Sequence, residues 1–318
     1  MKKGSGKLYL SVMVLLILIA VLAAGCTNQD RTKVKGIKER GKLDEEPTIT
    51  VELPTGGTKT MLIEEYITGV VAGEMEADWP INAYAAQAII ARTYAMEYME
   101  SKNTRKISGD FKESQAYHPE KVTDDIRKAI KITRGEVALY EGEYIRAWFH
   151  ASAGGQTTSA KVGLAFEYKE PPYTKKVKSP DDEAPADVKS WRASFTTSSI
   201  REAIKELTGT DVGEIREFRI GKKDDTGRAI NFIVQGSNGN EDIEAARLRT
   251  ALDPVQFKST KLASAKLSGQ KVIFSGSGYG HGVGMSQWGA YAMAKEGKSP
   301  EDIVKYYFND IEIKEMWD

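Results

Sequence analysis

The spacing of apolar residues in the segment 48–62 predicts a β-hairpin. Ile49, Val51 and Leu53 alternate with polar residues, which is the pattern of a half-buried strand. A Thr-Gly-Gly-Thr turn follows, and a second short apolar strand comes after it. Two strands joined by a short glycine-containing turn are expected to pair antiparallel.

The segment 63–74 changes to a helical period. Residues spaced at i, i+4, i+7, i+8 and i+11 lie on one face of a helix. Here that face consists of Ile63, Ile67, Val70, Val71 and Glu74. Glu74 therefore lies on the apolar face. Glu76 lies about 200° further round, because successive helical residues are rotated by about 100°, and it shares the outer face with Glu65.

A carboxyl group on the apolar face of a helix loses hydration unless it is paired or protonated. Burial raises the pKa of such a group towards the range that suits a general acid near neutral pH, which is what the leaving oxygen of a glycosidic bond needs. The alternative is a structural Glu74 that pairs with Arg92 or is capped by the next helix. Periodicity alone favours neither interpretation.

Residues 81–99, after Pro80, predict a second helix that is apolar on nearly all sides. Such a helix is usually buried at the centre of a domain. Its polar exceptions include Gln87 and Arg92, and a buried arginine needs a partner such as a carboxylate. Glu74 is a candidate partner of Arg92.

The segment 123–156 predicts a capped helix followed by a hairpin. Thr123 can cap the helix 124–133, and a turn at 141–142 joins two strands. The second strand, which leads to a flexible loop with Gln156, would place on one face Tyr144, Arg146, Trp148 and His150. Aromatic, histidine and glutamine side chains at a strand end suit a sugar-binding cleft, but a half-exposed sheet face explains them nearly as well.

The central part of the chain predicts a surface connection followed by mixed helices and strands. Prolines and charges mark residues 166–195 as the connection. Beyond it come a helix near 199–207, a hairpin with strands near 215–221 and 229–235, and a helix near 242–252. These elements favour an α+β fold, with antiparallel hairpins and helices in two lobes flanking a cleft and a lobe boundary near residue 170.

A second concentrated motif follows a short predicted strand at 271–274. Glycine occupies every second position from 276 to 284, His281 lies among these glycines, and a helix resumes near Ser286. Alternate glycines let the backbone approach a ligand closely. No Gly-Lys-Ser/Thr follows, which argues against a phosphate-binding loop. The sequence around Ser286 misses the hydrolase nucleophile elbow at its last residue.

Composition limits the classes of ligand. The chain has 318 residues, with 45 Lys and Arg against 45 Asp and Glu, so no overall basic field indicates a nucleic-acid partner. Its 3 histidines and 1 cysteine form no metal-binding motif, and a lone histidine in a glycine loop is more often a hydrogen-bonding residue than a ligand. We therefore expect no metal, no cofactor and no nucleic acid.

Residues 1–26 have the pattern of an export signal. Lysines precede an uncharged apolar run of about eighteen residues that ends at Ala-Ala-Gly-Cys. This resembles a bacterial lipoprotein signal, in which Cys26 becomes the lipidated N-terminus; the alternative is an uncleaved membrane anchor. Polar residues 27–46 then predict a flexible tether. Residues 47–318 are expected to form the folded body, on the extracytoplasmic face of the cell membrane.

The sequence contains two long motifs, VVAGEMEADWPINAYAAQAIIARTYAM and GYGHGVGMSQWGAYAMAKEGKSPEDIVKYYF. Both resemble the stage II sporulation protein D family, whose relatives include amidase enhancers. The stretches YIRAWFHASAGGQT and YTKKVKSPDD between them fit the family pattern in order. The resemblance covers the chain from about residue 47 to its C-terminus.

This resemblance implies a peptidoglycan lytic transglycosylase, which cleaves the MurNAc–GlcNAc bond and forms 1,6-anhydro-MurNAc. The family's substrate is glycan stripped of stem peptides, and an amidase acts in concert. The acid/base glutamate of the family corresponds to Glu74, and family members usually have proline where this chain has Glu76. One carboxyl group can serve both steps, because it protonates the leaving oxygen and then accepts the proton of the sugar's C6 hydroxyl. A hydrolase would need a second carboxyl group, for which Glu76 or Asp78 is available.

We further expect side chains around Glu74 to bind the glycan, with Arg92 orienting or pairing with Glu74. The predicted set is Arg92, His281, Ser286, Gln287, His150 and Gln156. Some relatives bind zinc through a Cys/His cluster, which this chain cannot build because Cys26 is its only cysteine. The second hypothesis is a non-catalytic wall-binding protein that stimulates an N-acetylmuramoyl-L-alanine amidase. The presence of Glu74 in the expected frame favours catalysis.

Overall fold

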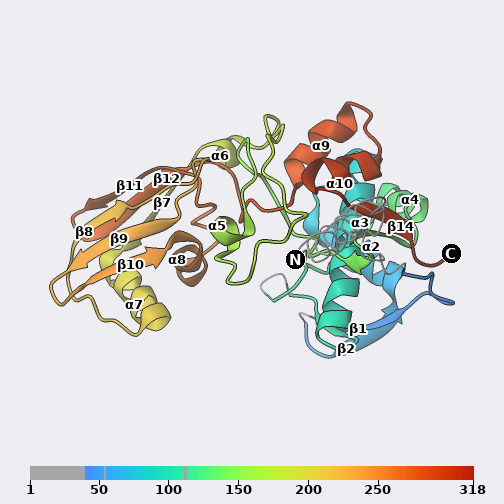
Figure 1. Cartoon of the computed structure of the whole chain (residues 1–318), viewed down its shortest axis with the longest axis horizontal. Coiled ribbons are helices and arrows are strands. Elements are labelled where there is room, and N and C mark those ends of the chain that lie inside the picture. The colour runs from blue at the N-terminus through green and yellow to red at the C-terminus, as the bar shows by residue number, and fades with distance from the viewer. Residues whose placement is uncertain (1–39, 54, 111–112) are drawn as a thin grey trace, which may run out of the picture. The chain divides into compact units, whose positions relative to one another are not determined.

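The computed structural model describes residues 40–318, apart from residues 54 and 111–112 (Figure 1). The expected signal segment with Cys26, and residues 27–39 of the expected tether, lie outside this description. Within the described ranges, no helix combines the length and the apolar character needed to cross a membrane.

Residues 40–46, which the sequence assigned to the tether, contact the folded body. The Leu43 N–H donates to the Met316 carbonyl oxygen at 2.7 Å. The Arg40 guanidinium pairs with the Glu100 carboxylate at 2.7 Å. The folded region therefore begins before residue 47.

Two hydrophobic cores organise the described chain, and the first contains the N-terminal helices together with the C-terminal end. This part of the chain has mixed secondary structure with three-stranded sheets in the orders β2-β1-β3 and β14-β4-β5. Its elements are β1 (Thr48–Glu52), β2 (Thr58–Leu62), α2 (Ile63–Glu74), α3 (Ile81–Ser101), β3 (Lys106–Ser108), η1 (Pro119–Lys121), α4 (Asp124–Ile132), β4 (Glu136–Tyr140), β5 (Glu143–Tyr144), α9 (Gln287–Lys295), α10 (Pro300–Tyr307) and β14 (Glu312–Glu315).

Helices α2 and α3 form as the apolar pattern predicts, and they pack against each other (Figure 1). The four aliphatic side chains of the apolar face of α2 are fully buried, and Glu74 is the last residue of the helix. Helix α3 is buried on nearly all sides from Ala83 to Met96, which confirms its central position. The predicted cap of α4 is also confirmed, because the Thr123 hydroxyl accepts the Ile126 N–H.

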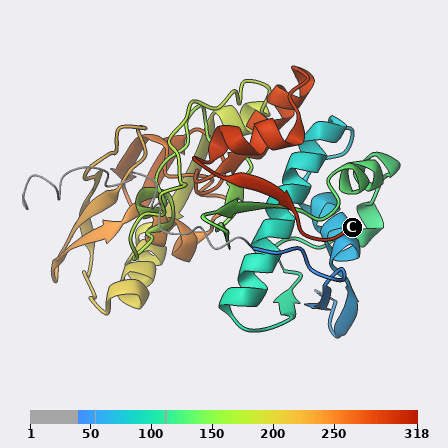
Figure 2. The same ribbon diagram turned by 45° about the vertical axis from the view of Figure 1, so that its right-hand side comes forward.

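The predicted hairpins form, with additional strands that the sequence did not predict. Strands β1 and β2 pair antiparallel, and β1 also pairs in parallel with β3. Strand β4 turns at 141–142 into β5. The C-terminal strand β14 pairs antiparallel with β4. Figure 2 shows this red strand next to green strands from the first half of the chain.

The second core contains residues between Trp191 and Phe274 and is rich in phenylalanine. Two antiparallel sheets, in the orders β10-β9-β8 and β11-β12-β7, contribute to it together with two helices. Its elements are β7 (Trp191–Thr196), α7 (Thr197–Thr208), β8 (Ile215–Ile220), β9 (Asn231–Gly236), β10 (Asn240–Glu244), α8 (Ala245–Leu252), β11 (Leu262–Ser268) and β12 (Lys271–Gly276). The helix expected near 242–252 therefore starts later, because residues 240–244 pair with β9 as a strand.

The segment between the two cores contains only short elements. They are β6 (Phe149–His150), α5 (Ala160–Leu164) and α6 (Ala186–Lys189), and β6 pairs in parallel with β13 (Met285–Ser286). The expectation of one strand running through to His150 is wrong: β5 ends at Tyr144, and β6 belongs to a different sheet. The α+β class is confirmed. Residue 170 falls in this connecting segment, whereas the return of the chain to the first core at Met285 was not predicted.

Candidate active site

A cavity of about 420 Å³ lies beside the C-terminal end of α2. Helix α2, strand β6, the glycine loop 276–284 and helix α9 each contribute side chains to its wall. Four residues that the sequence predicted for the site line it: Glu74, His150, His281 and Gln287. The two motifs that are far apart in the sequence therefore meet at this cavity.

Glu74 is a half-buried carboxyl group whose side chain makes one hydrogen bond to the described residues. Its Oε1 accepts the Ala116 N–H at 2.7 Å. Burial raises the pKa of Glu74 to about 7, although the hydrogen bond from Ala116 acts in the opposite direction. The position of Glu74 on the apolar face of its helix, predicted from periodicity, is confirmed. At neutral pH the group can therefore both donate and accept a proton.

Gln287 holds the backbone at Glu74. Its Nε2 donates to the Glu74 carbonyl oxygen at 3.1 Å and lies 3.5 Å from Gln87 Oε1. Gln287 can reach this position because α9 begins there, where the Ser286 hydroxyl accepts the Gly289 N–H as the N-cap. The contact joins α2, α3 and α9 around the cavity.

The glycine loop follows a path that side chains at two of its positions would block. Gly280 has φ +104, and a Cβ there would lie 2.7 Å from the Cβ of His150. Gly284 has φ +71, and a Cβ there would lie 2.1 Å from the Trp148 carbonyl oxygen. Glycine at these positions lets the loop lie directly against β6 and the residue before it.

The two histidines of the cavity are neutral at neutral pH. The Nδ1 of His150 donates to the Val283 carbonyl oxygen at 3.1 Å, and burial lowers the pKa of His150 to about 3. The Nδ1 of His281 accepts the Val283 N–H at 3.1 Å, and burial holds its pKa well below the usual range. Their ring centroids lie 5.4 Å apart. His150 Nε2, buried and without a partner among the described residues, is an acceptor.

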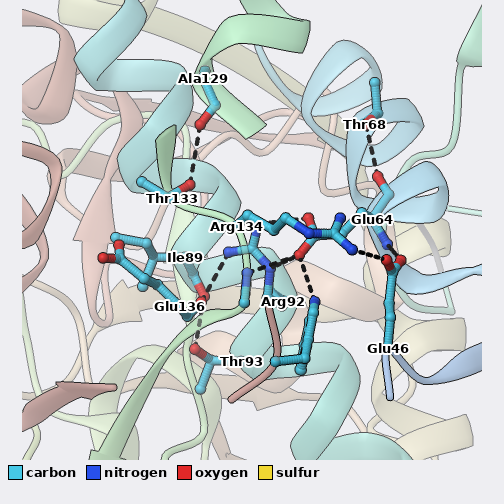
Figure 3. A network of polar contacts seen from close by, with 12 residues as sticks. Glu46, Glu64, Thr68, Ile89, Arg92, Thr93, Ala129, Thr133, Arg134 and Glu136 are labelled. Atoms are coloured by element: carbon cyan, nitrogen blue, oxygen red, sulfur yellow. Dashed lines mark hydrogen bonds and ion pairs between the residues drawn. The ribbon is translucent and has the colours of Figure 1, made fainter. Parts of the chain in front are cut away.

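The expected pairing of Arg92 with Glu74 is wrong. Arg92 is fully buried, and its Nε and Nη2 donate to the two carboxylate oxygens of Glu64 at 3.0 and 2.8 Å (Figure 3). Its Nη1 donates to the Glu136 carbonyl oxygen. The sequence offered a signal that was missed, because Glu64 precedes Ile67 by three residues and so borders the same buried stripe. Arg92 does not line the cavity and has no exposed surface for a glycan.

Ser286 and Gln156 also lie outside the cavity wall. The Ser286 hydroxyl is buried and donates to Asp181 Oδ1 at 2.8 Å, while it caps α9. Gln156 forms an isolated bridge with Lys178. The structure therefore gives Ser286 a structural contact and brings neither residue to Glu74.

A second cavity, of about 270 Å³, is also lined by Glu74. It shares four residues with the first cavity: Glu74, Ala151, Tyr279 and Gln287. Trp79 and Trp288 add aromatic surface, with ring centroids 4.7 Å apart. Glu76 is exposed and lines this cavity only. Among the glutamates that the structure describes, only Glu74 lines both cavities.

Several residues of the first cavity were not predicted. Tyr279 stands in the glycine loop two residues before His281, which was a usable signal. Tyr94 and Gln115 come from α3 and from the loop before η1, and Arg249 comes from α8 of the second core. Local patterns carry no sign that Arg249 reaches Glu74's cavity, because its own helix shows only ordinary amphipathic spacing.

The described residues contain no group of three or more His, Cys, Asp or Glu side chains that could hold a metal ion. The expectation that the protein needs no metal stays a prediction.

Two family models match the chain. One is described as stage II sporulation protein and matches residues 55–140, which include α2 and α3. The other is described as a domain of unknown function (DUF8618) and matches residues 173–284, which include the second core and the glycine loop.

Curated relatives match most of the chain. An uncharacterized protein of Brachyspira hyodysenteriae is 36% identical over 259 residues, which cover 79% of this chain and 66% of that protein. Stage II sporulation protein D of Bacillus subtilis is 30% identical over 272 residues, covering 80% of this chain and 74% of that protein. The amidase enhancer of Bacillus subtilis is 27% identical over 285 residues, and the match spans 39% of its length.

Proposed function

Because the chain belongs to the stage II sporulation protein D family, we propose that it is a peptidoglycan lytic transglycosylase with Glu74 as its acid and base. The family and the amidase-enhancer relative support a role connected with the cell wall. The finer assignment, cleavage of the MurNAc–GlcNAc bond with formation of 1,6-anhydro-MurNAc, is what the family resemblance implies, and the chemistry of the cavity is compatible with it.

The observation that carries the proposal is the position of Glu74, a half-buried carboxyl group with a raised pKa that lines both cavities. With a pKa of about 7, a half-buried carboxyl group is available as an acid at neutral pH, whereas an ordinary exposed glutamate is almost fully ionised. Protonated Glu74 gives its proton to the glycosidic oxygen as the bond from MurNAc C1 breaks. The resulting carboxylate takes the proton of the C6 hydroxyl as O6 bonds to C1, and this step regenerates the acid.

The two cavities beside Glu74 support a glycan chain that continues on both sides of the scissile bond. The first cavity offers neutral histidines and Gln287 as hydrogen-bonding groups. The second is lined by two tryptophans: Trp79 is buried beneath Trp288, and the half-buried ring of Trp288 suits packing against a sugar face. Glu74 lies where the two cavities meet, as a group that protonates a bond between neighbouring sugars should.

A second candidate function is stimulation of a cell-wall amidase without turnover. The observation that favours it is the 27% identity to an amidase enhancer. Both functions predict binding to peptidoglycan glycan strands, but only the first predicts new anhydro ends. Hydrolysis through Glu76 as a second carboxyl group would release reducing ends instead.

The test is product analysis with the full-length chain in detergent. Sacculi are incubated with the protein, with and without a cell-wall amidase. The soluble muropeptides are then separated by chromatography and identified by mass spectrometry. We expect 1,6-anhydro-MurNAc products that depend on Glu74. Stimulation of the amidase without anhydro products would support the enhancer function, and reducing ends would support hydrolysis.

The proposed location is the extracytoplasmic face of the cell membrane, through a lipid on Cys26. Cys26→Ala should release the protein from the membrane fraction or block its processing. Unchanged membrane retention with unchanged mass would favour an uncleaved anchor.

A further inference from the structure

The wall of the first cavity includes one arginine, and it comes from the second core. Among the described residues that line this cavity, Arg249 is the only lysine or arginine. Its Nε donates to the Phe257 carbonyl oxygen at 2.8 Å, and its Nη2 donates to the Pro254 carbonyl oxygen at 3.1 Å. These backbone contacts fix the guanidinium plane without neutralising its charge.

No carboxylate of the described residues pairs with Arg249. Burial lowers its pKa to about 10, so the group stays charged at neutral pH. The cavity's two histidines are neutral and supply no competing charge. Glu74 is not its counter-ion either, because the pKa of Glu74 is set by burial and by Ala116. Arg249 is therefore a fixed, partly desolvated cation with no counter-ion among the residues that the structure describes.

Arg247, two residues earlier on the same helix, provides a contrast. It is exposed and pairs with two surface carboxylates, those of Glu167 and Glu244. An arginine on α8 thus finds acidic partners where it faces solvent. The arginine that lines the cavity has no acidic partner among the described residues, and its Nη1 donates no hydrogen bond to them.

We propose that Arg249 is the residue that recognises a free carboxylate on the glycan, namely the lactyl carboxylate of a MurNAc unit. This inference rests on the proposed function for the identity of the substrate. GlcNAc is uncharged, and the lactyl group of MurNAc carries a charge only where the stem peptide is absent, because the peptide converts that carboxylate into a neutral amide. A fixed guanidinium forms a charge-assisted hydrogen bond with the carboxylate and loses it with the amide. Arg249 thereby selects peptide-free glycan.

The experiment measures binding, so that it does not depend on turnover. Full-length protein carrying Glu74→Gln, which prevents cleavage, is titrated with three probes: glycan strands with free lactyl carboxylates, the same strands with those carboxylates amidated, and strands that retain stem peptides. We expect the free strands to bind about 10- to 100-fold more tightly than the amidated ones, the range for a hydrogen bond to a charged group. Equal affinity for free and amidated strands would overturn the proposal, and this comparison requires no change at Arg249.

Substitutions then assign the preference to the residue. Arg249→Gln should bind free and amidated strands equally, Arg249→Lys should retain part of the preference, and the matched control Arg247→Gln should retain all of it. If folded Arg249→Gln still prefers free over amidated strands by the full factor, Arg249 is not the residue that recognises the carboxylate. Equally tight binding of peptide-bearing and free strands by the protein that retains Arg249 would also contradict the proposal. If the protein with Glu74 intact prefers free strands but releases no anhydro products, the proposed function fails while the role of Arg249 stands.

Discussion

The two ends of helix α2 carry glutamates in opposite situations. Glu64, in the first turn, is buried and fully partnered: its carboxylate accepts hydrogen bonds from Arg92, the Gly135 N–H and the Trp317 indole. Glu74, the last residue, has one hydrogen bond from a backbone N–H and faces two cavities. The helix dipole favours a negative charge at the N-terminal end and disfavours it at the C-terminal end. Glu64 is therefore tied into a buried ion pair with Arg92, whereas Glu74 lines the cavities and can exchange a proton with a substrate.

This difference teaches that burial alone does not identify a catalytic carboxyl group. Glu64 is the more buried of the two and is surrounded by a network that includes Glu46 and Arg134 (Figure 3). A carboxylate that is paired with a buried guanidinium and lines neither cavity cannot reach a substrate oxygen. The decisive features of Glu74 are incomplete pairing and access to a cavity.

The largest expected effect is on stability, from Glu64→Gln. The substitution keeps the shape but leaves the buried Arg92 guanidinium without a counter-charge, so the free energy of unfolding should fall by about 3–5 kcal/mol. Urea denaturation measures it. The matched control is Glu65→Gln on the same helix, which breaks only an exposed pair with Lys59 and should cost less than about 1 kcal/mol. Equal losses for the two variants would contradict the structural role of Glu64.

Glu74→Gln, in contrast to Glu64→Gln, should reduce activity and not stability. The amide cannot give or take the proton, so the release of anhydro-muropeptides should fall by on the order of 10² or more. Stability at neutral pH should hold or rise, because the variant removes a desolvated acid. Product release is followed by chromatography and folding by circular dichroism. A folded Glu74→Gln protein that releases anhydro products near the wild-type rate would disprove the assignment.

The pH dependence should separate the two glutamates further. Glu74 donates its proton first, so kcat/KM should fall about tenfold per pH unit above pH 7. The raised pKa also means that the folded state holds this proton more tightly than the unfolded state. The stabilisation from this tighter proton binding is complete below about pH 4.5 and is lost as the pH rises through 7. The free energy of unfolding of wild type should therefore fall relative to that of Glu74→Gln between these two pH values. If the free energies of unfolding of wild type and Glu74→Gln differ by the same amount at pH 4 and pH 8, the pKa of Glu74 is not raised in the folded state.

The smallest effect is expected from Glu76→Gln. Glu76 is exposed, lies outside the first cavity and stands on the outer side of the chain after α2. Activity should change only a few-fold, since the substitution touches neither Glu74 nor its hydrogen bonds. Anhydro-product rates at saturating substrate measure the change. Loss of all activity in Glu76→Gln, with Glu74 intact, would transfer the catalytic role to Glu76.

The sequence by itself determined the local elements and the position of Glu74 within them. A helical period from Ile63 predicted both α2 and the apolar side on which Glu74 lies, and alternate glycines with Ser286 predicted the loop and the start of α9. These features depend on residues within one or two turns of each other. Local spacing is enough to define them.

Only the tertiary structure decided which partners these elements meet. Both Glu64 and Glu74 were available to Arg92, and the packing of α2 on α3 together with Gly135 and Trp317 selected Glu64. Likewise, Arg249 reaches the cavity because the second core holds α8 there, which no pattern within α8 encodes. Partner choice depends on contacts between segments far apart in the chain, and periodicity describes only one segment at a time.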